Sequence, residues 1–93
     1  MTVKQTIKKL HKFDIIAVQW KDITTDSSWV EEKKIEDFKP SKCTSIGFFI
    51  GRKGDNITIS YSYDFDLKCG AVEVIPIGVI LGITKHGVVN RTA

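Results

Sequence analysis

The 93-residue sequence has little of what signals catalysis or metal binding. Its two cysteines and two histidines stand far apart, with no C-x-x-C or H-x-x-x-H pair: Cys43, Cys69, His11 and His86. Structural zinc sites usually take their ligands in close pairs, and a reactive thiol needs a base beside it. We therefore expect no metal site, no cofactor, no catalytic residue and no enzymatic activity.

Long apolar runs are also absent. The longest, AVEVIPIGVILGI (71–83), is interrupted by Glu73 and Pro76, and is shorter than the roughly 20 residues with which a helix spans a bilayer. Residues 1–13 carry lysines where a signal peptide has its apolar segment. These features predict a soluble, cytoplasmic protein without a membrane partner, in which both cysteines are reduced thiols.

Positive charge is scarce outside the N-terminal segment. The chain has 14 basic and 11 acidic residues, a net charge of +3. Residues 1–13 hold four lysines and no acid, so they carry +4, and the rest of the chain carries −1 from 10 basic and 11 acidic residues. A nucleic-acid-binding domain normally shows a basic stripe across its folded face, so nucleic acid is retained only as the alternative partner.

The sequence is rich in segments with the residue pattern of β-strands. In NITISYSYDFD (56–66) apolar and polar residues alternate, which predicts an inward face of Ile57, Ile59, Tyr61, Tyr63 and Phe65. Four further segments, DIIAVQW, KCTSIGFFIG, AVEVI and VILGIT, read as short strands between turns. The pattern predicts a mainly β fold, a small SH3-like barrel of five antiparallel strands, because closure removes unpaired edges. The alternative is an open antiparallel sheet covered by two helices (α+β).

One domain accounts for a chain of this length. We expect a basic arm or short helix at 1–13, a single β-barrel domain at 14–84 and a tail at 85–93. In the arm, Ile7 and Leu10 have the spacing of an apolar helix face that docks on the body.

A second helix is predicted at 29–38, inserted after the first strand. Ser28 and Glu31 have the spacing of a capping box, and acidic residues fall in the first turn, as the helix dipole prefers. Ile35 and Phe38 are expected to form its buried edge.

Five residues are candidates for binding. Trp29 stands in the most polar stretch, where it either covers one end of the barrel or contacts a partner. Arg52 and Lys53 lie at a predicted hairpin tip, GRKGDN, where cations and backbone amides can hold a phosphate or simply keep a turn soluble. Tyr61 and Tyr63 have rings on which bases can stack, on a face that also carries core isoleucines.

Four ordered motifs run through residues 14–84: V-x-W-x-D, S-x-W, P-x-x-C-x-S-I-G and I-P-x-G-x-I-x-x-I. The matching residues are Val18, Trp20, Asp22, Ser27, Trp29, Pro40, Cys43, Ser45, Ile46, Gly47, Ile75, Pro76, Gly78, Ile80 and Ile83. With these motifs the chain resembles a family of small accessory proteins encoded by tailed bacteriophages.

The resemblance implies a non-enzymatic protein that acts by binding in the cytoplasm of an infected bacterium. Its expected role is counter-defence or host inhibition, by binding a host or defence-system protein or by sequestering a small nucleotide signal. A ligand site in so small a protein is readily built between subunits, so a homo-oligomer is one expected form. The alternatives are a small barrel that binds single-stranded nucleic acid and a structural phage module without a ligand.

Overall fold

The described part of the chain folds into one antiparallel sheet with three short helical segments. The computed structural model describes residues 1–23 and 28–89. The elements, in chain order, are α1 (Val3–Lys8), β1 (Asp14–Asp22), α2 (Glu32–Ile35), β2 (Ser41–Lys53), β3 (Asn56–Asp64), β4 (Cys69–Pro76), the 3-10 helix η1 (Ile77–Val79) and β5 (Ile80–Val88). The prediction of a mainly β fold with five antiparallel strands is confirmed.

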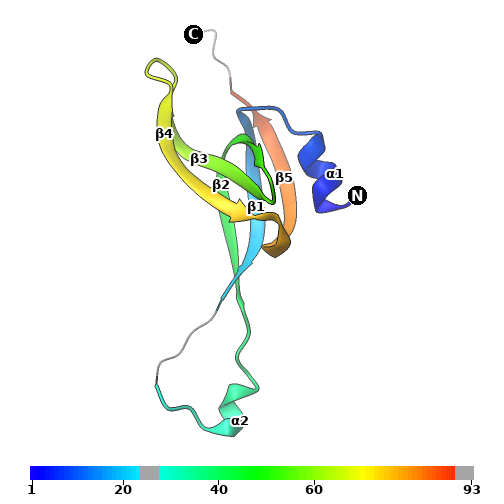
Figure 1. Cartoon of the computed structure of the whole chain (residues 1–93), viewed down its shortest axis with the longest axis vertical. Helices are drawn as coiled ribbons and strands as arrows, with labels where there is room; N and C mark the ends of the chain where they lie inside the picture. Colours follow the sequence, from blue (N-terminus) through cyan, green and yellow to red (C-terminus); the bar gives the residue numbers. More distant parts are fainter. Residues whose placement is uncertain (24–27, 90–93) are drawn as a thin grey trace.

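The strand order is β4-β3-β2-β1-β5, and each neighbouring pair is antiparallel (Figure 1). Strands β1 to β4 follow one another as a meander, and the chain then passes through η1 so that β5 pairs with β1. The single tight turn before the last strand is as predicted, whereas the closed barrel expected from the sequence is not formed. The sheet is not closed, because β4 and β5 are its two outer strands.

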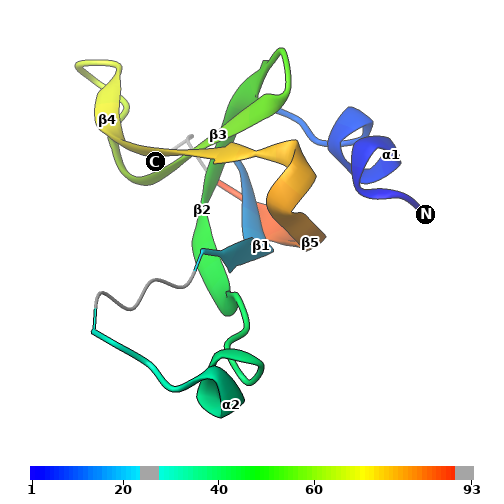
Figure 2. The same ribbon diagram turned by 60° about the horizontal axis from the view of Figure 1, so that its bottom comes forward.

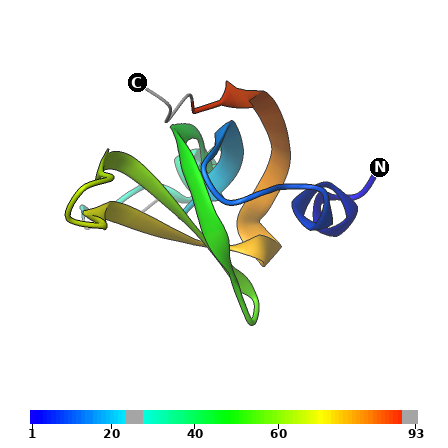
Figure 3. The same cartoon turned by 90° about the horizontal axis from the view of Figure 1, so that it is seen from above.

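Bulges curl the sheet into an open half-barrel. The β1–β2 ladder is regular, but register shifts interrupt the β1–β5, β2–β3 and β3–β4 ladders. An extra residue on one strand increases the local twist and bends the sheet. Figure 3, a view from above, shows that the sheet is curved and that α1 lies beside β5.

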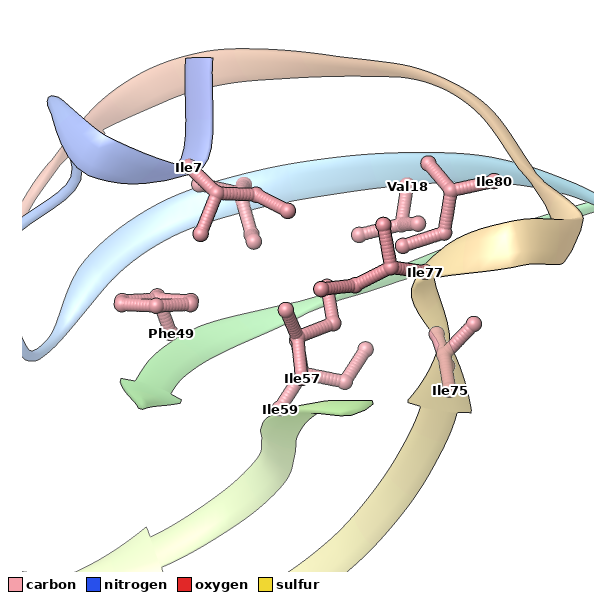
Figure 4. Packing of buried hydrophobic residues seen from close by; sticks show 9 residues of the cluster. Ile7, Val18, Phe49, Ile57, Ile59, Ile75, Ile77 and Ile80 are labelled. Atoms are coloured by element: carbon pink, nitrogen blue, oxygen red, sulfur yellow. The ribbon is translucent and has the colours of Figure 1, made fainter. Parts of the chain in front are cut away.

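The core lies on the concave face of the sheet and consists mainly of isoleucine. Its buried members are Ile7, Ile16, Val18, Phe49, Ile57, Ile59, Ile75, Ile77 and Ile80. Figure 4 shows Ile7 reaching this cluster from α1, while Ile77 and Ile80 reach it from the η1 turn. The docking of the N-terminal helix through Ile7 and Leu10 is confirmed, because Ile7 is buried and Leu10 packs against the cluster.

A bulge in β3 overturns the expectation that five alternating residues share the inward face. Ser60 pairs with Val72 but Ser62 pairs with Ala71, so Tyr61 is the extra residue, and its side chain is 65% exposed. The buried Ser60 hydroxyl lies 2.8 Å from the carbonyl oxygens of Ser62 and Ala71 and donates its hydrogen to them. The bulge therefore moves the residues beyond it onto the other face.

Two consecutive side-chain hydrogen bonds link strands β1, β2 and β4. Trp20 Nε1 donates to Ser45 Oγ at 3.0 Å, and Ser45 Oγ donates to Glu73 Oε1 at 2.5 Å. Trp20 is half-buried and packs against the core cluster. The first tryptophan is therefore part of the scaffold and joins β1 to β2 and β4.

The buried carboxylate of Asp14 joins the start of β1 to β5. Asp14 is only 2% exposed; its Oδ2 accepts from the His11 backbone N–H at 2.8 Å and lies 3.4 Å from Lys85 Nζ. The His11 N–H is the strongest influence and lowers the pKa of Asp14 below its ordinary 3.8, Lys85 lowers it further, and burial opposes both.

The predicted tail at 85–93 begins within strand β5, which includes Lys85 and ends at Val88. Strand β5 continues to Val88 because its ladder to β1 reaches the pair of Asp14 and Val88. Residues 90–93 of that tail lie outside the described residues.

We expect Asp14→Asn to lower the free energy of unfolding at about pH 7 by roughly 1–2 kcal/mol, because it removes the charge from both contacts. A carboxyl whose pKa is depressed in the folded state stabilises the fold above its unfolded pKa, and this stabilisation is lost as the pH falls through the folded pKa. The difference between the two proteins should therefore shrink towards about pH 2, measured by urea unfolding. Glu36→Gln, at an exposed carboxyl, is the matched control; an Asp14→Asn deficit that does not change with pH would contradict this account.

Candidate functional site

The segment that carries Trp29 stands away from the body of the protein. We call residues 28–40 the Trp29 arm. Strands β1 and β2 extend as a ribbon, with Trp20 opposite Cys43 and Asp22 opposite Ser41, and the arm lies beyond the end of this ribbon. Figures 1 and 2 show α2 separated from the sheet, and the chain measures 58 × 30 × 23 Å. In the part of the chain that the structure describes, no strand packs extensively against α2.

The prediction of a helix at 29–38 with a buried edge is wrong. The helix is a single turn, Glu32–Ile35, and the Ser28–Glu31 capping box is not formed, because Glu31 is the N-cap and makes no side-chain capping bond. Ile35 is 55% exposed and Phe38 is 45% exposed. Helix-favouring residues do not stabilise so short a helix in water without a surface to pack on.

Trp29 does not cover the end of the barrel. Its side chain is 105% exposed, as much as in an extended chain. Trp20, in contrast, packs against the core cluster and donates a hydrogen bond to Ser45. The interpretation in which Trp29 covers one end of the barrel is therefore wrong, and its contact with a partner stays a prediction.

Residues of the arm line a hollow of about 500 Å³. The residues lining it are Ser28, Trp29, Val30, Glu31, Lys34, Asp37 and Phe38. Its apolar part is the indole, the valine and the phenyl ring, and charged groups surround them. Across the whole arm four acids stand against three lysines, a net charge of −1.

The hairpin prediction around Arg52 and Lys53 is confirmed, but the two side chains lie on a different part of the molecule from Trp29. Strand β2 ends at Lys53 and β3 begins at Asn56, with Gly54 at a positive φ of 59°. Arg52 Nε donates to the Gly54 carbonyl at 2.9 Å, so part of the guanidinium stabilises the turn.

The structure separates the two predicted tyrosines. Tyr61 is the exposed bulge residue, whereas Tyr63 is half-buried in a cluster of rings on the outer face. The ring centroids of Tyr63, Phe13 and Phe65 are 5.0 Å apart in each pair, and Phe48 lies 6.1 Å from Phe65. The alternating pattern of the sequence did not predict this cluster. The cluster depends on the β3 bulge and on contacts with Phe13, which directly precedes β1.

The chemistry-bearing side chains are dispersed over the part of the chain that the structure describes. Cys43 is half-buried on β2, and Cys69 is exposed at the start of β4; both are free thiols. Within residues 1–23 and 28–89, no three His, Cys, Asp or Glu side chains gather in a group that could hold a metal ion. None of the helices in these ranges has the length and apolar character needed to cross a membrane.

Comparisons with known proteins provide no relative to set beside this site. No family model, no curated protein and no solved structure matches the chain. The function is therefore inferred from the arm and from the other surfaces of the molecule.

Trp29→Ala should leave the free energy of unfolding within about 0.5 kcal/mol of the original protein, because no packing is lost. Trp20→Ala should cost about 2 kcal/mol or more, since it removes packing and the hydrogen bond to Ser45. Urea unfolding followed by circular dichroism measures both. A large stability loss in the Trp29 variant would show that this side chain is buried.

Proposed function

We propose that this protein is a non-enzymatic binding module that inserts the Trp29 arm into an apolar groove of a partner protein. The observation that carries the proposal is the full exposure of Trp29. A tryptophan buries about 150–250 Å² when covered, and tryptophan is enriched at the centres of protein interfaces. An indole held in solvent by a fold that already has a well-packed core is suited to a contact outside the chain.

The neighbours of Trp29 support a protein partner. Ile35 and Phe38 add exposed apolar surface, while Glu31, Lys34 and Asp37 stand around it. An apolar centre with a polar rim is the usual composition of a protein interface. The small net charge of the arm gives no strong field of one sign that would select nucleic acid or a membrane surface.

The shape of the arm favours a protein groove over a small ligand. Sites for small molecules enclose most of the ligand within walls from several elements. The hollow of the arm is built from one segment of the chain, at the end of a ribbon that projects from the body (Figure 2). A projecting segment of this kind is itself suited to being enclosed by its partner.

The single turn of α2 gives the arm a way to respond to the partner. A four-residue helix without a capping bond has little to stabilise it alone. Contact with a groove that covers Trp29, Ile35 and Phe38 would stabilise this turn while it buries apolar area. Binding of this kind inhibits a target by occupying a surface that the target needs for its own partner.

The resemblance to accessory proteins of tailed bacteriophages indicates the class of partner. In that setting the proposed partner is a host protein or a component of a bacterial defence system, in the cytoplasm of the infected cell. The motif that contains Trp29 is one of the four that carry the resemblance, so the proposed contact residue lies within it.

Trp29→Ala should weaken binding to such a partner about thirtyfold, the effect of losing roughly 2 kcal/mol at an interface hot spot. Proteins captured from infected-cell lysate by the original chain identify the partner, and its Kd for each variant is then measured with purified proteins. The matched control is Leu67→Ala, which removes an exposed side chain outside the arm and should leave the Kd unchanged.

A partner that binds the Trp29→Ala protein with the original Kd would overturn the role of the arm. Analytical ultracentrifugation of the purified protein tests whether the arm contacts a second copy of the chain instead. A dimer that Trp29→Ala converts to a monomer would show that the arm contacts another copy instead of a foreign protein.

A further inference from the structure

A second site lies on the outer face, where the link from α1 to β1 meets the turn between β3 and β4. It is a pocket of about 250 Å³, and its lining residues are Lys12, Phe13, Tyr63, Phe65 and Lys68. Three aromatic rings and two ammonium groups therefore line it. The pocket shares no lining residue with the Trp29 arm.

The rings form a well-defined platform. Phe13, Tyr63 and Phe65 pack edge-to-face or tilted against one another, with interplanar angles of 57–64°. Each of them is half-buried, so part of each ring remains open to solvent. Gly70, the partner of Tyr63 across the ladder, leaves room for its ring: a Cβ there would lie 2.8 Å from Tyr63 Cδ2.

Backbone strain marks both sides of this pocket. Within residues 1–23 and 28–89, Phe13 (φ 73°) and Lys68 (φ 55°) are the two residues other than glycine with a positive φ. This conformation is unfavourable for a residue with a side chain, and such strain is concentrated at functional sites. Two separate turns therefore adopt an unfavourable conformation at the same place.

Specific hydrogen bonds fix Phe13 and the turn that precedes Lys68. The Phe13 N–H donates to the Phe49 carbonyl at 2.6 Å, which fixes the start of β1 against β2. In the β3–β4 turn the Asp64 carboxylate accepts from the backbone N–H groups of Asp66 and Leu67 at 2.9 and 3.0 Å. These bonds define the turn that places Lys68 beside the rings.

The charge of the pocket is positive. Lys12 Nζ lies 5.1 Å from the centre of the Phe13 ring, and Lys68 lines the same pocket. The acids of the nearby turn, Asp64 and Asp66, do not line it. Lys4 and Lys8 on α1 and Lys9 directly after it are three further lysines, and residues 1–11 hold no acid, so the segment that leads to the pocket is basic.

We infer that this pocket binds one nucleotide unit of a single-stranded nucleic acid, independently of the partner of the Trp29 arm. A base stacks on the open ring surfaces, and Lys12 and Lys68 contact the flanking phosphates. Stacking platforms beside cations are the usual means by which small β-folds bind single strands.

The small pocket together with the lysines of the N-terminal segment favours a strand over a free nucleotide. Sites that enclose small molecules measure about 300–1,000 Å³, and this pocket is smaller. A free nucleotide would therefore be held by few contacts. A strand adds further phosphates that reach the lysines of α1, and each of these contacts raises the affinity at low salt.

The test measures binding of a fluorescent oligo-dT strand of about 12 nucleotides by anisotropy, with the full chain at several salt concentrations. Lys12→Gln/Lys68→Gln should weaken binding at least tenfold and reduce the slope of log K against log salt by about 1.4, the value for two lost phosphate contacts. Lys21→Gln/Lys42→Gln removes the same charge from exposed residues of the β1–β2 ribbon and should change the Kd less than threefold. Tyr63→Leu should weaken binding about tenfold through lost stacking, and thermal unfolding shows that each variant is folded.

Three results would overturn the inference. The first is no binding at low salt, and the second is an equal loss in the two double-lysine variants, which would mean that only net charge matters. The third is competition by the free nucleotide dTMP as effective as that by the strand at equal nucleotide concentration, which would make this a mononucleotide site. Trp29→Ala should bind the strand as the original protein does, so this site and the arm can fail separately.

Discussion

The arrangement of surfaces on this protein depends on one extra residue in β3. Up to Ser60, alternate residues of the strand enter the core, and beyond Tyr61 the alternation is shifted, so Tyr63 and Phe65 lie with Phe48 on the outer face. The single hydrogen of the buried Ser60 hydroxyl is shared between the carbonyl oxygens of Ser62 and Ala71 at this bulge. A core and an aromatic pocket are thereby made from a single strand.

An open sheet of five strands needs other means of protecting its core. Helix α1 contributes Ile7, and η1 contributes Ile77, so two short segments complete a cluster that strands alone leave uncovered (Figure 4). The Asp14 carboxylate fixes the link between α1 and β1 to Lys85 on β5. The N-terminal segment is thus a structural part of the domain as well as its most basic region.

The two proposed binding surfaces lie at opposite ends of the long axis. The Trp29 arm is at the end of the β1–β2 ribbon, and the aromatic pocket is beside the β3–β4 turn (Figure 1). Neither surface takes a residue from the core, so each can vary while the scaffold stays intact. Their separation also allows a partner protein and a nucleic-acid strand to be bound at the same time.

The sequence by itself determined the strands, the hairpin at Gly54, the tight turn after Pro76 and the docking of Ile7, because alternation, turn residues and helical spacing are local signals. It predicted too long a helix around Trp29, since helix-favouring residues do not reveal whether a surface lies behind them. The exposure of Trp29, the bulge at Tyr61 and the meeting of Phe13 with Tyr63 were decided by the tertiary structure. Each depends on what a distant segment places next to the residue, and a local pattern carries no information about that.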